Sequence, residues 1–263
     1  MLRVAIIASG LEYQEGAAWA AATFAHVAPA AAAVQVLIPA GEQQSPVLNQ
    51  HAALYKFSVN EFPFKRISQN KFTSQLKCQG YLHIVSATPT GDVLLLVDAD
   101  TYCTRPLILS GTLKKEIGTG KIGMVRDVKD RHFNRPRCPW YLRPEERVPY
   151  VNSGVILTTR SSIDLFDTFA SLSAEERFLR GPFNDQKVIN YALGKFFRDR
   201  LVILDSIYNG MRKYLTAETI IGHCAGGAGR FGSSMQNRKA AHQKICQNIL
   251  DRNPGAIELK TTP

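Results

Sequence analysis

Two carboxylates follow directly after an apolar run in the middle of the chain. The segment LLLVDADTYC, residues 94–103, places Asp98 and Asp100 behind four apolar residues. A continuous apolar run of this kind is typical of a strand that is covered on both faces of a sheet. Because side chains two residues apart in an extended segment point to the same side, we expect the two carboxylates to converge. Paired carboxylates at a strand end suit Mn²⁺ or Mg²⁺, which prefer oxygen ligands.

The Asp-x-Asp pattern is short and common, so a structural interpretation stays open, in which one carboxylate caps a turn and the other is hydrated. Three later segments with polar side chains beside apolar runs favour a functional site. They are PYVNSGVILTTR (149–160), with Asn152, Ser153 and Gly154; GPFNDQKVIN (181–190), with Asn184, Asp185 and Gln186; and IIGHCAGGAGR (220–230), with His223, Gly226 and Arg230.

Each of these segments has a chemical and a structural interpretation. A glycine inside a strand often marks the close approach of a ligand or of another backbone, but residues 152–154 could also form a strand bulge. Asn184 suits a helix cap, after which Asp185 could simply complement the helix dipole. His223 follows an apolar pair, a position that ordinary buried histidines also occupy. Only the occurrence of all these polar residues together favours the chemical interpretation over the structural one.

The elements that must position these residues alternate along the chain. We expect strands at 3–8, 34–38, 92–97, 122–125, 150–157, 201–204 and 219–222, and helices at 16–27, 71–86, 161–172 and 184–193. Such alternation predicts an α/β sheet with helices on both faces. A long polar loop, residues 126–149, carries Trp140 and Tyr141, which would suit stacking on a sugar ring.

Composition limits the classes of protein that fit. The chain has 263 residues and 45% hydrophobic content, enough for one sizeable core. Its net charge is +10, and residues 186–263 hold 12 Lys/Arg against 5 Asp/Glu, which favours an anionic partner. Five scattered cysteines without a CxxC pair indicate neither a disulfide framework nor a zinc site. The opening residues fit a strand better than a signal peptide, so we expect a cytoplasmic protein.

In this order, the four polar segments resemble the GT-A glycosyltransferases, most closely glycosyltransferase family 8 and its relatives. The matching residues are Asp98-Ala99-Asp100 for Asp-x-Asp, Asn152-Ser153-Gly154 for Asn-x-Gly, Asp185 to Asn190 for Asp-Gln-x-x-x-Asn, and His223 to Gly226 for His-x-x-Gly. The resemblance covers roughly residues 1–232. It implies a Rossmann-like mixed sheet flanked by helices, in a single domain with a donor-binding half, about 1–125, and an acceptor-facing half, about 126–232. A basic helical extension, 233–263, follows.

The resemblance also implies roles for individual residues. Asp98, Asp100 and His223 would bind Mn²⁺, or Mg²⁺, against the diphosphate of a nucleotide sugar, with Asp185 and Gln186 as the catalytic residues near the anomeric carbon. The implied donor-binding residues are Ala8, Ser9, Gly10, Tyr13, Asp98, Ala99, Asp100, Asn152, Ser153, Gly226 and Arg230. Arg230 stands one residue beyond the lysine that family 8 usually carries, where this chain has Gly229. Arginine could serve the same end, because its fork matches phosphate geometry.

The expected partners follow from the same resemblance. A UDP-sugar is the favoured donor, and the acceptor is sugar-containing or anionic, with a membrane-borne acceptor and peripheral membrane contact left open. Retention of anomeric configuration is favoured. A sugar-phosphate nucleotidyltransferase is an alternative, although its phosphate loop would want a Lys or Arg that ASGLEYQEG, residues 8–16, lacks. A basic nucleic-acid-binding protein is a second alternative, but the chain shows no such motif and we expect no nucleic-acid partner.

Overall fold

The computed structural model describes residues 1–27, 32–67, 72–127, 142, 144–146, 148–176, 178, 185–211, 215–224 and 235–252. Its strands are β1 (Leu2–Ile7), β2 (Ala32–Pro39), β3 (Ser58–Phe62), β4 (Val93–Val97), β5 (Thr101–Cys103), β6 (Ile122–Arg126), β7 (Val151–Thr159), β8 (Leu201–Leu204), β9 (Gly210–Met211) and β10 (Ile221–His223). Its α-helices are α1 (Leu11–Val27), α2 (Pro46–Tyr55), α3 (Phe72–Ala87), α4 (Gly111–Gly118), α6 (Ile163–Ala174), α8 (Asp185–Phe196) and α9 (Met235–Leu250). Short 3₁₀ turns are η2 (Pro144–Glu146), η3 (Arg160–Ser162), η4 (Arg198–Arg200) and η5 (Ser206–Asn209).

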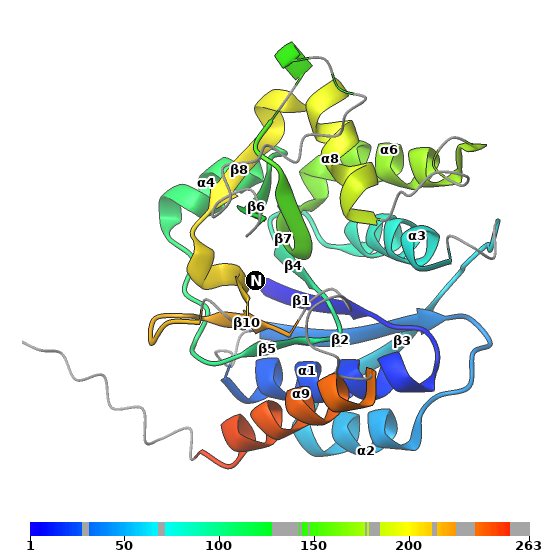
Figure 1. Cartoon of the computed structure of the whole chain (residues 1–263), viewed down its shortest axis with the longest axis vertical. Coiled ribbons are helices and arrows are strands. Elements are labelled where there is room, and N and C mark those ends of the chain that lie inside the picture. Colours follow the sequence, from blue (N-terminus) through cyan, green and yellow to red (C-terminus); the bar gives the residue numbers. More distant parts are fainter. Residues whose placement is uncertain are drawn as a thin grey trace, which may run out of the picture.

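The main sheet has seven strands in the order β3-β2-β1-β4-β7-β6-β8 (Figure 1). All neighbouring pairs are parallel except those of β7, which runs antiparallel to both β4 and β6. The carboxyl ends of β1, β4, β6 and β8 therefore share one edge of the sheet with the start of β7. The backbone N–H of Asp98 donates to the Gly154 carbonyl at 3.0 Å across this edge. Two of the polar segments meet there.

The central strands are apolar because helices cover both of their faces. Every residue of β4 and β7 is buried. Along β4, Leu95 packs into the core under α1, α2 and α4, while Leu94 and Leu96 pack into the core under α3, α6 and α8. Burying a leucine side chain contributes about 1.5–3 kcal/mol. The apolar run thus fixes the strand on both sides and leaves its polar end at the sheet edge.

A second, three-stranded sheet explains how His223 reaches the start of the acidic segment. Its order is β5-β10-β9, and β10 is antiparallel to β5 with His223 opposite Thr101. The backbone N–H of Cys224 donates to the Asp100 carbonyl at 2.9 Å. This pairing joins parts of the chain that are more than a hundred residues apart, and it places the histidine beside the two aspartates.

The strands and helices expected from the sequence are present, with shifted ends, but several elements were missed. The sequence interpretation omitted β3, β5, β9, α2 and α4, and it began the first helix at Gly16, whereas α1 begins at Leu11. Gly16 lies inside α1, and a Cβ there would come within 3.1 Å of the Ala99 carbonyl oxygen. The helix therefore runs close to the acidic segment. Trp140 and Tyr141 of the long loop lie outside the described residues.

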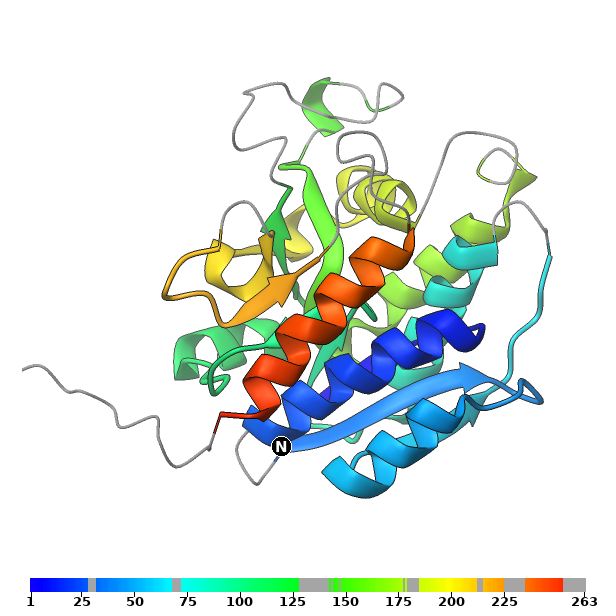
Figure 2. The ribbon, with the colours of Figure 1, turned by 60° about the horizontal axis from the view of Figure 1, so that its bottom comes forward.

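The helix expected near the C-terminal end is α9, which lies along α1 (Figure 2). Lys239 forms an ion pair with Glu15 of α1. The buried His242 contacts the Thr101 carbonyl through Nε2 at 2.9 Å. Helix α9 is thus held against the strand that follows the two aspartates, and at least one of its basic side chains forms an ion pair within the chain.

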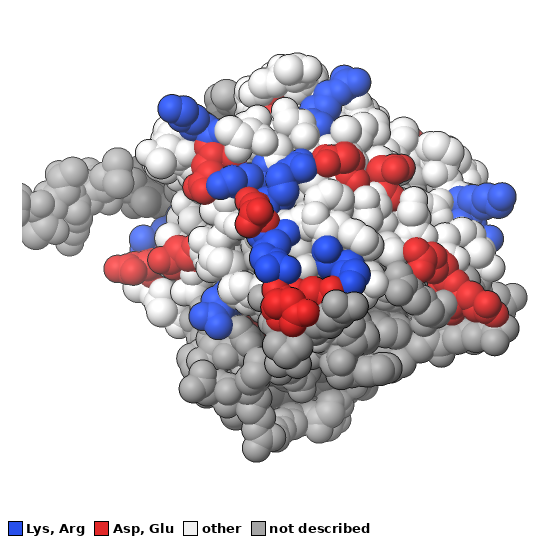
Figure 3. Space-filling view, turned by 90° about the horizontal axis from the view of Figure 1, so that it is seen from above, with Lys and Arg blue, Asp and Glu red and all other residues white. Residues whose placement is uncertain are grey.

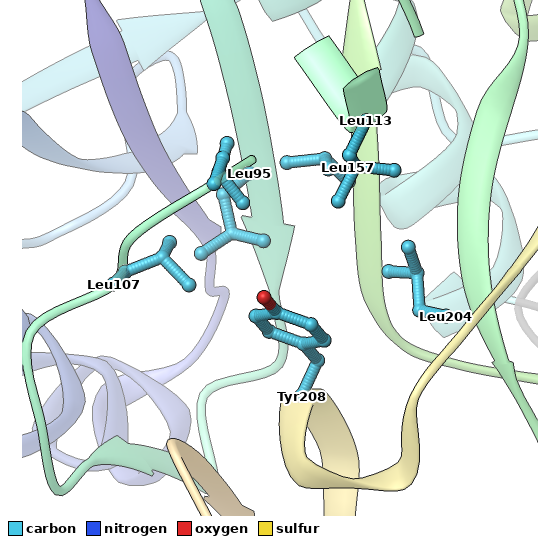
Figure 4. Close-up of a pocket in the computed structure, with 7 residues that line it drawn as sticks. Leu95, Leu107, Leu113, Leu157, Leu204 and Tyr208 are labelled. Atoms are coloured by element: carbon cyan, nitrogen blue, oxygen red, sulfur yellow. The ribbon is translucent and has the colours of Figure 1, made fainter. Parts of the chain in front are cut away.

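Two further views show the described residues away from the polar end of the sheet. On the face seen in Figure 3, lysines and arginines are interspersed with acidic side chains. Figure 4 shows a small apolar pocket, which is lined by Leu95, Leu107, Leu109, Leu113, Leu157, Leu204 and Tyr208. This lining is suited to packing and carries no charged group. None of the described helices is long and apolar enough to cross a membrane.

Candidate functional site

The two aspartates lie in a turn at the carboxyl end of β4. The Thr101 backbone N–H donates to the Asp98 carbonyl at 3.1 Å, and the Thr101 hydroxyl donates to the same oxygen at 2.7 Å. The expectation that Asp98 and Asp100 converge because they lie on an extended segment was therefore wrong in its geometry, since a turn separates them. Their carboxylates nevertheless lie close together, because the turn brings the two side chains to the same side.

His223 completes a cluster with these carboxylates. Its Nε2 lies 3.2 Å from Asp100 Oδ1 and 3.7 Å from Asp98 Oδ2, and one ligand atom from each residue lies within 4.8 Å of the others. The imidazole is 2% exposed. It packs over Gly154, where a Cβ would lie 2.1 Å from His223 Cε1. A close approach does occur at this glycine, but the approaching group is a side chain, the imidazole, and not a ligand or a backbone. The pairing of β7 with β6 also shifts its register at this segment, which agrees with the strand-bulge interpretation.

The electrostatics of the cluster favour a bound cation. Burial raises the pKa of the Asp98 carboxyl above its ordinary value, although Lys77 and His223 act against this shift. Desolvation acts in the same direction at Asp100, but His223 outweighs it and holds this pKa well below the usual range. Burial lowers the pKa of His223, and Asp100 and Asp98 outweigh that effect, so its pKa is raised. Positive charge is therefore stabilised here.

The chemistry of the donors fits a divalent metal. Two carboxylate oxygens and one imidazole nitrogen form a mixed O/N set, and the side chain of Asp100 is still 48% exposed toward solvent. Mg²⁺ prefers oxygen ligands, whereas Mn²⁺ accepts an imidazole more readily. Asp98, Asp100 and His223 could therefore hold such an ion and leave room for oxygens of a ligand.

Lys77 on α3 bridges this cluster to the residues at the start of α8. Its Nζ lies 2.6 Å from Asp98 Oδ1 and 3.0 Å from Asp185 Oδ2. Burial alone would lower the pKa of Lys77, but Asp185 and Asp98 hold it well above its ordinary value. The pKa of Asp185 is lowered because Lys77 outweighs the effect of burial. The sequence interpretation missed Lys77, although a lone lysine in an otherwise uncharged helix was a usable signal.

Asn152, Ser153, Asp185 and Gln186 come together, as the sequence interpretation required. Ser153 Oγ donates to Asp185 Oδ2 at 2.8 Å. Gln186 Oε1 accepts from Asn152 Nδ2 at 3.2 Å, and Gln186 Nε2 donates to Asp127 Oδ2 at 3.1 Å. Asp127 follows β6 at the same sheet edge and was also missed. Its place is set by the antiparallel pairing of β6 with β7, which a single sequence does not reveal.

Asn190 has a structural task instead. Its Oδ1 accepts from the Val151 backbone N–H at 2.8 Å, and its Nδ2 donates to the Val151 carbonyl at 2.8 Å. These two bonds clamp α8 to the start of β7. The last residue of the Asp-Gln-x-x-x-Asn segment therefore aligns the first two with the sheet edge.

The loop after β1 is held by Glu42, which the sequence interpretation missed. Ser9 Oγ donates to Glu42 Oε2 at 2.7 Å, and the Gly10 backbone N–H also donates to this carboxylate. Gly10 has φ of 78°, a left-handed conformation that favours glycine. Ala8 is buried and continues the sheet, whereas Tyr13 is 54% exposed on the first turn of α1.

Three of the expected residues cannot be placed. Gly226, Arg230 and the expected helix cap Asn184 lie outside the described residues. Ala99 lies in the acidic turn and faces Gly16 of α1. The acidic turn and the start of α1 are therefore neighbours at the sheet edge.

Comparison with known proteins identifies the fold. Neither a protein-family model nor a curated protein sequence matches the chain. Among solved structures, the galactosyltransferase LgtC, in complex with donor and acceptor sugar analogs, matches with a TM-score of 0.61 and 15% identity over 92% of this chain and 95% of its own. GlyE of Streptococcus pneumoniae matches with a TM-score of 0.59 and 14% identity over 97% of this chain and 62% of its own. Mouse xyloside xylosyltransferase 1 matches with a TM-score of 0.53 and 15% identity over 86% and 98%.

These likenesses confirm the expected fold class. The chain has the GT-A fold of glycosyltransferases, with a mixed seven-stranded sheet between helices.

Proposed function

We propose that this chain is a metal-dependent glycosyltransferase that moves a sugar from a nucleoside-diphosphate sugar to an acceptor. The proposal depends above all on the meeting of Asp98, Asp100 and His223 at the carboxyl edge of a GT-A sheet. Ligands of open α/β sheets bind at this edge. Retention of anomeric configuration is part of the proposal through the family resemblance alone.

In this proposal Asp98, Asp100 and His223 hold Mn²⁺ or Mg²⁺. When bound, such an ion supplies Lewis-acid stabilisation of the charge on a departing diphosphate. Lys77 and His223 contact different oxygens of the Asp98 carboxylate. Lys77 contacts Oδ1, and His223 contacts Oδ2. Asp98 is therefore held from two directions and cannot turn freely away from the ligand.

The loop after β1 would hold the base and the ribose. Glu42 fixes the conformation of Ser9 and Gly10, and the exposed ring of Tyr13 is available for stacking on a base. Donor contact by Ala99 is supported by its place in the acidic turn, next to α1. A UDP-sugar remains the favoured donor.

The transferred sugar would lie against Asp185 and Gln186. Lys77 keeps Asp185 ionised, so this carboxylate can accept a hydrogen bond from a sugar hydroxyl. Gln186 is held from both ends of its amide, by Asn152 and Asp127. A group fixed in this way is preorganised, which lowers the cost of orienting it against the anomeric carbon.

The acceptor would lie on the side of residues 126–232, with the donor against residues 1–125. We propose a sugar-containing or anionic acceptor, free or carried at a membrane surface, for a protein of the cytoplasm. The basic segment 233–263 supports an anionic acceptor only through cations other than Lys239, because Lys239 is paired with Glu15. Gly226 and Arg230 stay predicted diphosphate contacts.

Thermal-shift screening tests the proposal. UDP-, GDP-, CMP- and dTDP-sugars are added with Mn²⁺ or with EDTA. One nucleoside-diphosphate sugar should raise the melting temperature only when Mn²⁺ is present, because a ligand at 100 times its Kd stabilises the folded state by about 2.7 kcal/mol. Stabilisation by none of them would contradict the proposal. Release of pyrophosphate from a nucleoside triphosphate and a sugar phosphate would instead favour the nucleotidyltransferase alternative.

A further inference from the structure

We infer that Asn209 is a positioning residue, which holds the imidazole of His223 so that Nε2 faces Asp98 and Asp100. The inference rests on the metal site of the proposed function. Asn209 ends η5 directly before β9, and it is 1% exposed. A fully buried asparagine must satisfy its amide with partners, because an unpaired buried polar group costs about 1–3 kcal/mol.

The amide of Asn209 has two well-placed partners. Its Oδ1 lies 3.0 Å from His223 Nδ1, and its Nδ2 donates to Asn152 Oδ1 at 2.8 Å. Asn152 in turn donates to Gln186 Oε1. The side chains form a continuous line of hydrogen bonds from the imidazole to Gln186 and, beyond it, to Asp127.

Groups that can act in only one way fix the direction of this line. The backbone N–H of Gly154 donates to Asn152 Oδ1 at 2.8 Å, so this atom must be an acceptor. Asn152 Nδ2 is then the donor to Gln186, in agreement with the Ser153 backbone N–H, which donates to the same Gln186 oxygen at 3.4 Å. At the far end, the Asp127 carboxylate requires a donor from Gln186.

The orientation of Asn209 follows from these constraints. Because Asn152 Oδ1 is an acceptor, the group of Asn209 that faces it must be the NH₂, and Oδ1 must face His223. An amide oxygen can only accept, so His223 Nδ1 is an N–H donor, and the other ring nitrogen, Nε2, is directed at the two carboxylates. Outer hydrogen bonds of this kind orient a metal-binding histidine, and their loss typically costs 10- to 100-fold in metal affinity.

Two substitutions of Asn209 separate this role from simple packing. Asn209→Leu has the same number and branching of side-chain heavy atoms and removes both hydrogen bonds, whereas Asn209→Asp keeps an acceptor for His223 Nδ1 and removes the donor to Asn152. Both variants lose the bond to Asn152, so a general disturbance of the core would affect them alike. Asn60→Leu on β3, an exposed site, is the matched control.

The measurement is Mn²⁺ binding to each folded variant, followed by the electron paramagnetic resonance of free Mn²⁺, without nucleotide. We expect Asn209→Leu to weaken Mn²⁺ binding about 10- to 100-fold, and Asn209→Asp and Asn60→Leu to stay close to wild type. Equal weakening in the two Asn209 variants, or none in Asn209→Leu, would overturn the inference. If Asn209→Leu does not fold, Asn209→Ala, which also removes both hydrogen bonds, takes its place with the same expected and contradicting results.

The same data keep the inference apart from the proposed function. A wild type that binds Mn²⁺ and shows the difference between the variants, but is stabilised by no nucleotide sugar, would sink the glycosyltransferase proposal and leave the role of Asn209 standing. If the wild type binds nucleotide sugars with Mn²⁺, but the Asn209 substitutions leave the Mn²⁺ affinity unchanged, the role of Asn209 fails and the glycosyltransferase proposal stands.

Discussion

Two neighbouring groups of polar residues at the carboxyl edge of the sheet satisfy their charges in different ways. The amide cluster, consisting of Asn152, Ser153, Asp185 and Gln186, is joined by hydrogen bonds among its own members and by the ion pair of Asp185 with Lys77. The acidic cluster consists of Asp98, Asp100 and His223. Its two carboxylates have only the imidazole and Lys77 as cationic partners, and Lys77 is also paired with Asp185.

The difference indicates a division of labour. Groups whose partners are all supplied by the protein are rigid and can orient a ligand without reorganising. Two partly buried carboxylates that lie close together repel each other, and a bound cation relieves this repulsion. Lys77 links the two clusters, because it contacts one carboxylate of each.

The largest expected effect comes from removing a charge from the acidic cluster. Asp100→Asn should lower the turnover of the nucleotide-sugar donor by about 10²- to 10³-fold, because metal stabilisation of the leaving group provides several kcal/mol and each 1.36 kcal/mol is tenfold in rate. Steady-state hydrolysis of the donor measures the loss. The control is Asp199→Asn in η4, which is exposed and should change little. Wild-type turnover in Asp100→Asn would show that the cluster does not act through a metal.

Removing the lysine that joins the clusters should mainly reduce stability. Lys77→Met leaves Asp98 and Asp185 without their shared cation, and breaking a buried pair in this way costs about 3–5 kcal/mol. Urea denaturation without metal gives the free energy of unfolding. The control is Lys121→Met: Lys121 is 34% and its partner Glu116 is 41% exposed, so its loss should cost about 0–1 kcal/mol. Similar costs for the two variants would mean that Lys77 is not a structural link.

A methyl group at Gly154 should disturb the contact between the clusters. Gly154→Ala places a Cβ against His223 Cε1 and within 2.9 Å of Asn152 Oδ1, and such overpacking costs about 1–3 kcal/mol. We expect weaker Mn²⁺ binding together with reduced stability, measured by calorimetry and by urea denaturation. Gly111→Ala is the matched control, since a Cβ there meets nothing within 4 Å. Unchanged Mn²⁺ affinity in Gly154→Ala would contradict the placement of His223.

The smallest effect is a pH dependence at the back of the acidic turn. Burial lowers the pKa of His242 below its ordinary 6.5, and the Thr101 carbonyl only partly opposes this. The unfolded chain then binds the proton more readily, so the stability that neutral His242 provides is complete above pH 6.5 and is lost as the pH falls below it. His242→Gln should flatten this loss. Urea denaturation at several pH values gives the difference from wild type, and a constant difference between pH 7 and pH 5 would contradict the expectation.

Much of the fold could be predicted because local patterns decided it. The apolar run 93–97 had to become a strand covered on both faces, and β8 was predicted with its observed bounds, Leu201–Leu204. By contrast, α2 begins at Pro46 behind Ser45, a signal that was present and overlooked. Strands β5 and β9 are only three and two residues long and exist through pairing with β10, which no local pattern encodes.

The candidate site shows the same limit. The three expected ligands do meet, although the geometry assumed for Asp98 and Asp100 was wrong. Lys77, Asp127 and Asn209 were missed because each acts through a partner on another element, which only the fold brings next to it. A hydrogen bond between Asn209 and His223 depends on the small sheet, and the sequence alone did not predict that sheet.

Calorimetry of nucleoside diphosphate binding, with and without Mn²⁺, tests the central claim most directly. The titrant is the diphosphate of whichever base gives the largest thermal shift, and the protein is wild type or Asp100→Asn. If the acidic cluster binds a cation that in turn binds the diphosphate, Mn²⁺ should tighten binding to wild type at least about tenfold, a coupling of about 1.4 kcal/mol, and should have no such effect on Asp100→Asn. Equal affinity of wild type in Mn²⁺ and in EDTA would contradict the account.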